Sequence, residues 1–235
     1  MKLSQSVLLL FVIATLAALP VTAKAQALAD TGAPSESVAS STPQTGLFYA
    51  RPTQAIKLHN YLFDAFGPYP MVGAAAVAGV GQVDNTPPAW GQGAAGYGKR
   101  FGSDFGIAAI TTTTRYGLAQ ALKEDTLYYR CECMGLFPRL KHAVVSTLTA
   151  RHGEDGHRVF SFSAAVAPYA GTVTAVYAWY PDNYGARSGL RMGNYNLLGN
   201  VGENILLEFF YSGPHSLLSR MHLNDRRAAP DPDSK

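Results

Sequence analysis

The stretch Tyr97–Leu122, YGKRFGSDFGIAAITTTTRYGLAQAL, lies in the longest proline-free part of the chain, between Pro88 and Pro138. It is much too long for a strand, and it lacks proline, the residue that interrupts helices. We therefore predict a helix here. The neighbouring apolar stretches are also long, so we predict a mainly α fold, a compact helical bundle rich in small residues.

Two glycine triplets repeat at a spacing of four residues: Gly98, Gly102 and Gly106, and Gly185, Gly189 and Gly193. Residues four apart share one face of a helix, so each triplet predicts a smooth face for a second helix. Glycine in a helix costs roughly 1 kcal/mol relative to alanine, which close packing would offset. We favour tight packing for the first triplet and a turn for the second.

The remaining apolar stretches are separated by turn signals and lie at residues 54–66, 71–83, 136–151, 159–180 and 191–211. One region departs from the helical pattern. Val159–Ser163 alternates apolar and polar residues after the polar turn Gly153–Gly156, which is typical of a strand. We expect one short β-hairpin near residues 147–163.

The N-terminus predicts export. Met1–Lys2 is a short positive start, Val7–Val21 is a dense apolar run, and Ala23–Ala25 has the small-x-small form of a cleavage site. This layout is that of a secretory signal peptide, and the run is too short for a membrane span of roughly 20 residues. The expected location is the periplasm or the outer membrane.

The composition divides the chain further. The Ser/Thr/Pro-rich segment before residue 47 has few large apolar residues and is typical of a disordered linker. We assign residues 1–25 to a signal peptide, 26–46 to this linker, 47–223 to a single helical domain and 224–235 to a disordered tail.

The charge of the chain argues against one class of partner. The formal net charge is only +3, and no long Lys/Arg block is present. A nucleic-acid-binding domain needs a basic patch or stripe. We therefore expect no nucleic-acid partner and expect a membrane surface or an envelope protein instead, with the oligomeric state left open.

Two loops approach cofactor or metal motifs without meeting their requirements. Gly93–Lys99 matches a P-loop, but Arg100 stands where the motif needs Ser or Thr to hold Mg²⁺. His152–His157 contains four possible metal ligands, but its two glycines are ordinary turn chemistry. We expect no cofactor and no metal site, with Lys99 and Arg100 solvated or bound to an anion.

The only cysteines, Cys131 and Cys133, are separated by one residue. An oxidising compartment would permit a disulfide, but its narrow geometry disfavours a bridge between positions this close. We favour two thiols, at least one of them buried, and keep a redox or soft-metal role as the alternative.

The candidate site combines six polar residues: Lys99, Arg100, Asp104, Asn200, Glu203 and Asn204. The last three share one helix face, for which we favour exposure to solvent over a buried network or a ligand site. The adjacent carboxylates Glu124 and Asp125 point apart on a helix, so a solvated helix end is favoured over acid–base work. No catalytic motif is found, and the catalytic residues are unassigned.

Val159–Tyr180 is the longest charge-free stretch after the signal peptide, and it is of spanning length. It contains no Leu or Ile and carries several Ser, Thr, Gly and Pro residues. We favour a buried helix over a membrane span for this stretch.

Three segments resemble a family of exported, mainly helical bacterial cell-envelope proteins with no assigned activity. They are Gly96–Gly102, Glu124–Arg130 and Ala178–Pro181, within a similarity that spans about residues 70–210. Thr126 stands where the family pattern has Pro, and the Cys131–Cys133 step is unusual for it. The resemblance implies a compact helical envelope domain and no active site.

These observations favour an exported cell-envelope protein with a structural or binding role, in the periplasm or associated with a membrane. The alternative from another class is a periplasmic hydrolase acting on lipid or cell-wall material. An outer-membrane β-barrel is a third interpretation, but it needs many segments of about ten alternating residues, and we find about two.

Overall fold

A computed structural model describes residues 49–131 and 133–210 of the chain. These residues fall within one compact unit, Ala39–Lys235. The predicted signal peptide, linker and tail all lie outside the described residues.

The fold is mainly helical with one small antiparallel sheet, which confirms the predicted fold class. The elements are α2 (Gln54–Phe66), α3 (Pro68–Val83), α4 (Gly93–Ala121), β1 (Glu124–Asp125), α5 (Leu136–Ser146), β2 (Thr149–His152), β3 (His157–Phe160), α6 (Phe162–Ala178) and α7 (Ala186–Phe210), with a short 3-10 turn at Pro88–Trp90. The strands pair in the order β1-β2-β3. Strands β2 and β3 form the hairpin predicted near residues 147–163.

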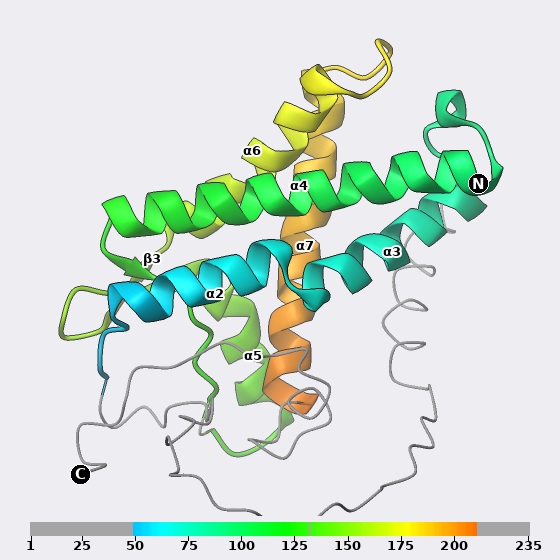
Figure 1. Ribbon diagram of the computed structural model, residues 1–235. Helices are drawn as coiled ribbons and strands as arrows, with labels where there is room; N and C mark the ends of the chain where they lie inside the picture. Colours follow the sequence, from blue (N-terminus) through cyan, green and yellow to red (C-terminus); the bar gives the residue numbers. More distant parts are fainter. Residues whose placement is uncertain (1–48, 132, 211–235) are drawn as a thin grey trace, which may run out of the picture. The chain divides into compact units, whose positions relative to one another are not determined.

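The helices pack on one another in pairs that form a series. Helices α2 and α3 follow one another along α4, α4 packs on α6, α6 on α7, and α7 on α5 (Figure 1). The buried apolar side chains are mostly alanines, with Ala78, Ala167 and Ala175 fully buried. Such small side chains let neighbouring helices approach closely.

Glycine allows close approach at two helix crossings. Where α4 meets α6, a Cβ on Gly171 would collide with Thr111 and lie 2.7 Å from the carbonyl oxygen of Ile107. Where α6 meets α7, a Cβ on Gly189 would lie 3.1 Å from the Cα of Val173. A larger residue at either glycine would therefore push the helix backbones apart.

The tight packing that we favoured for the first glycine triplet is wrong for two of its members. A Cβ on Gly98 or Gly102 would meet no atom within 4 Å, and one on Gly106 would be in ordinary contact with Trp179. In the second triplet, the turn that we favoured is wrong for Gly189 and Gly193, which lie within α7, and a Cβ on Gly193 would collide with the ring of Tyr169. The spacing identified glycine faces, but the tertiary fold decides which of them meets a helix.

Residues 162–178 form the helix that we favoured for the charge-free stretch, and eight of its residues are buried. Among the helices described here, none has both the length and the hydropathy that crossing a membrane requires.

Candidate functional site

The predicted site is divided between two places in the structure. Lys99, Arg100 and Asp104 lie on the first half of α4, whereas Asn200, Glu203 and Asn204 lie on α7. The three α7 residues are half-buried rather than exposed to solvent. Asn204 donates a hydrogen bond of 3.0 Å to the hydroxyl of Thr147, just after α5. This amide therefore belongs to a hydrogen-bonded contact between two helices.

Arg100 is a buried structural residue, with only 2% of its surface exposed. Its guanidinium donates to the carbonyl oxygens of Thr86 (2.8 Å), Gly91 (2.9 Å) and Pro87 (3.1 Å), and to Gln82 Oε1 (2.6 Å). The loop between α3 and α4 is thus folded around one side chain. Arg100 is neither solvated nor open to an anion, in contrast to our expectation.

Asp104 lies one helical turn after Arg100, and burial and the Asp104 charge both raise the pKa of Tyr180. Burial raises the pKa of the Asp104 carboxyl to about 7, although the charge of Arg100 acts in the opposite direction. The neighbouring Ser103 hydroxyl accepts a hydrogen bond of 2.8 Å from the Trp179 indole. This half-buried carboxyl therefore titrates near neutral pH.

Asp104→Asn should make the stability of the protein less dependent on pH. The raised folded-state pKa means that the folded protein binds more protons than the unfolded chain between about pH 4 and about pH 7. Stability from this group is therefore lost as the pH rises through that window. Between about pH 4 and about pH 8, we expect the wild type to lose on the order of 2 kcal/mol more than the variant. Urea unfolding at both pH values measures the loss of stability in the wild type and in the variant. Equal losses in the two proteins would contradict a desolvated Asp104.

The adjacent carboxylates after α4 are buried, so the predicted solvated helix end is wrong. Glu124 is 5% exposed and accepts hydrogen bonds from Ser161 Oγ (2.7 Å) and Phe162 N (3.1 Å), at the N-terminus of α6. A carboxylate is favoured there by the free N–H groups and the helix dipole. Glu124 thus ties strand β1 to the start of α6.

Asp125 is equally buried and faces two tyrosines. It accepts hydrogen bonds from Tyr129 OH (2.5 Å), Tyr49 OH (3.1 Å) and Leu127 N (3.0 Å). Burial and the Asp125 charge both raise the pKa of Tyr129 and of Tyr49, so these hydroxyls remain protonated donors. These three partners of Asp125 are therefore all neutral groups.

Glu208, which the sequence pattern did not single out for the site, is the fully buried carboxylate of α7. It accepts hydrogen bonds from Arg139 Nε (2.9 Å), Tyr128 OH (2.8 Å) and Cys131 N (3.0 Å). Burial raises the pKa of Glu208, but the hydrogen bonds from these three donors outweigh it, so the pKa lies below its usual value. Glu208 thus remains ionised and holds the 128–131 segment against α7.

Cys131 and Cys133 are joined by a disulfide, which replaces the two thiols that we favoured. Their Cα atoms are 5.2 Å apart, within the usual range for such a bridge.

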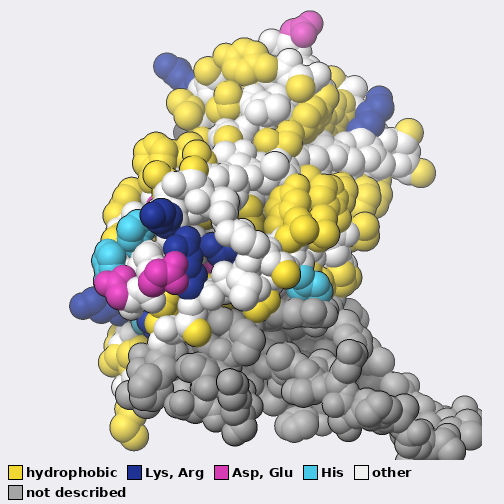
Figure 2. All heavy atoms as spheres, turned by 60° about the vertical axis from the view of Figure 1, so that its left-hand side comes forward, with side chains coloured by type: hydrophobic (Ala, Val, Ile, Leu, Met, Phe, Trp, Pro, Cys, Tyr) yellow, Lys and Arg dark blue, Asp and Glu magenta, His cyan; other side chains and the backbone are white. Residues whose placement is uncertain are grey.

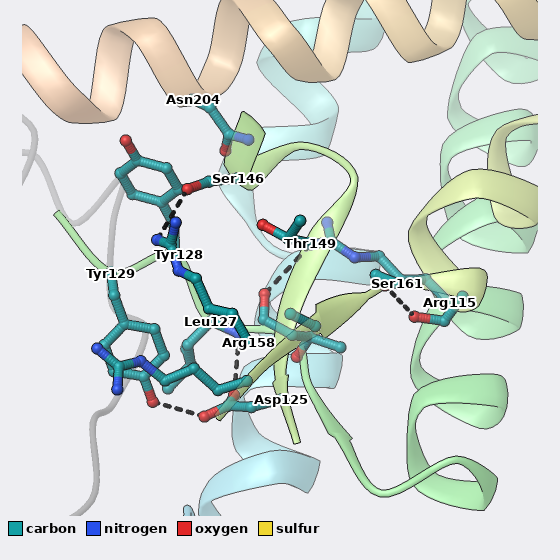
Figure 3. Close-up of a pocket in the computed structure, with 14 residues that line it drawn as sticks. Arg115, Asp125, Leu127, Tyr128, Tyr129, Ser146, Thr149, Arg158, Ser161 and Asn204 are labelled. Atoms are coloured by element: carbon teal, nitrogen blue, oxygen red, sulfur yellow. Dashed lines mark hydrogen bonds between the residues drawn. The ribbon is translucent and has the colours of Figure 1, made fainter. Parts of the chain in front are cut away.

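A polar cavity of about 20 Å³ lies between the sheet and helices α4, α5 and α7. Figure 3 shows labelled side chains that reach it from different elements: Arg115 from α4, Ser146 from α5, Arg158 from β3 and Asn204 from α7. Arg151 from β2 also lines it. A volume of this size accommodates about one water-sized group.

The three arginines of the cavity have few partners. Arg115 donates to the carbonyl oxygen of Thr126 (3.2 Å), and Arg158 donates to Ser146 Oγ (3.2 Å) and to His142 Nε2 (2.5 Å). Arg151 stacks on the ring of Tyr129, 4.5 Å from its centroid, and its Nε is buried without a hydrogen bond. Burial and the charge of Arg151 both lower the pKa of Arg158.

The acidic side chains of the hairpin loop that resembles a metal motif are already paired, one within the loop and one with Arg51. Asp155 accepts a hydrogen bond of 2.8 Å from His157 Nδ1, and Glu154 pairs with Arg51 at 2.9 Å. Within residues 49–131 and 133–210, no three His, Cys, Asp or Glu side chains are grouped to hold a metal ion. Figure 2 shows basic, acidic and histidine side chains gathered in one area, whereas apolar side chains cover much of the remaining face.

Comparison with protein families, with curated proteins and with solved structures finds no match to this chain. The resemblance to an exported helical family therefore stays a prediction.

Proposed function

We propose that this chain is an exported cell-envelope protein with a binding or structural role, located in the periplasm or at a membrane surface. The observation that carries the proposal is the three-part layout of residues 1–25. The polar interior supports binding rather than catalysis. Its carboxylates Glu124, Asp125 and Glu208 all accept several fixed hydrogen bonds, so none is left as an open general base.

The outer face of α3 supports association with a membrane surface or an envelope partner. This helix carries no charged residue, and its side chains Tyr69, Val72, Val77 and Val83 are exposed. An apolar helix face of this kind is usually covered in the working state of a protein.

Fractionation of the native host, followed by a carbonate wash, tests this proposal. We expect the protein in the envelope fractions, either released with the periplasm or retained with the membrane until the wash. Recovery in the cytoplasm would contradict it.

The alternative hydrolase is favoured by one arrangement beside the cavity. Ser161 and Ser163 both donate hydrogen bonds to Glu124, and both hydroxyls line the cavity that contains Arg115. Ester turnover by the exported protein that is lost in Ser161→Ala would favour this alternative.

A further inference from the structure

Strands β2 and β3 place two positive charges directly opposite one another. Arg151 and Arg158 are register partners across the hairpin. Like charges in this position are destabilising unless something compensates them. Arg115 brings a third guanidinium to the same cavity from α4. The hairpin thus contributes to a cationic centre whose charge needs a partner.

The neighbouring carboxylates do not supply that partner. In the part of the chain that the structure describes, none of the three arginines forms an ion pair with Asp or Glu. Asp125 lines the cavity, but it accepts hydrogen bonds from two tyrosines and a backbone N–H. Counting Glu124 and Asp125 against Arg115, Arg151 and Arg158 leaves the centre with an excess positive charge.

The centre also has more donors than acceptors. Each guanidinium presents a fork of N–H donors, and these three arginines use only a few of them in hydrogen bonds. The amide of Asn204 and the hydroxyl of Ser146 add further polar groups to the wall. A ligand that satisfies this wall must be rich in acceptors and negatively charged.

We propose that this cavity, bounded by Arg115, Arg151 and Arg158, is a binding site for a phosphate group. Arginine forks match phosphate oxygens in geometry and charge. The cavity admits about one water-sized group, which is the size of a single phosphate oxygen. Arg158 is exposed at the surface, so the rest of the ligand remains outside.

The proposal deepens the binding role given above and rests on it. The phosphate is either free or carried by a lipid headgroup, because both present the same oxygens. An envelope protein encounters both free phosphate and lipid headgroups. Binding experiments with inorganic phosphate and with lipid vesicles distinguish the two sources.

Isothermal titration calorimetry with inorganic phosphate tests the site. The whole chain, expressed with its own leader, is recovered from whichever fraction contains it and titrated at constant ionic strength. We expect saturable binding that weakens about tenfold or more in Arg158→Met and in Arg115→Met, because each loses a charge-assisted hydrogen bond. Arg191→Met, which removes the same charge from an exposed position of α7, should bind within about twofold of wild type.

Circular dichroism identifies variants that fail to fold, and Arg158→Lys keeps the charge while it removes the fork. Sedimentation with phosphatidylcholine vesicles, with and without phosphatidate, identifies the source. Pelleting only with phosphatidate, reversed by inorganic phosphate, assigns the site to a headgroup, whereas calorimetric binding without pelleting assigns it to free phosphate. No saturable binding of either probe, or equal binding by folded Arg158→Met and Arg115→Met, would overturn the proposal. A cytoplasmic location would refute export alone and leave this result standing.

Discussion

Arg100→Met is expected to destabilise the protein by about 3–5 kcal/mol, the range for breaking a buried charged network. The guanidinium is almost fully buried, and it donates to three carbonyl oxygens and one amide oxygen of the loop before α4. Methionine fills a similar volume but removes the guanidinium donor from each of these acceptors. Because the guanidinium joins four residues of this region, we expect the loop to unfold before the helices do.

Urea unfolding measures the loss, and Lys99→Met is the matched control. Lys99 is exposed and precedes Arg100 on the same helix, so its replacement should change stability by less than about 0.5 kcal/mol. Equal stabilities of the two variants would show that the Arg100 hydrogen bonds do not hold the loop.

Gly171→Ala is expected to destabilise the protein by about 1–3 kcal/mol, the range for overpacking. The new methyl group would collide with Thr111 and approach the backbone carbonyl of Ile107, where α4 crosses α6. A backbone atom cannot move aside as a flexible side chain can. The gain in helix propensity from alanine, about 1 kcal/mol, therefore does not compensate.

The same substitution on α4 should have the opposite sign. A Cβ on Gly98 would meet no atom within 4 Å, so Gly98→Ala gains helix propensity without a clash. We expect it to stabilise the protein by about 0.5–1 kcal/mol. Thermal unfolding of the two variants under one set of conditions checks whether Gly171→Ala destabilises the protein and Gly98→Ala stabilises it. Destabilisation by Gly98→Ala would mean that another surface covers this face of α4.

The helices could be predicted because their evidence is local. Tyr97–Leu122 is too long for a strand and contains no proline, and α4 occupies nearly that stretch. The hairpin was predictable for the same reason, since alternation and a glycine-containing turn are short-range signals. Burial of the carboxylates was not predictable, because their partners come from distant parts of the chain. Glu124, for example, is bound by residues 37 and 39 positions later.

Only part of the candidate site could be predicted from the sequence. Residues of α4, α5, α7, β2 and β3 all contribute to the arginine cavity, and spacing along one helix cannot reveal such a meeting. One signal was nevertheless present. Arg151 and Arg158 lie at equal distances from the centre of the Gly153–Gly156 turn, so a hairpin there places them opposite one another. Arg115 carried no comparable local signal.

The intact mass of the protein recovered from the native envelope tests the central claim, export, most directly. We expect a chain shortened at its N-terminus, beginning at Gln26 or at Leu28 after cleavage behind a small residue. Recovery of the uncleaved 25.1 kDa chain from the cytoplasm would contradict it.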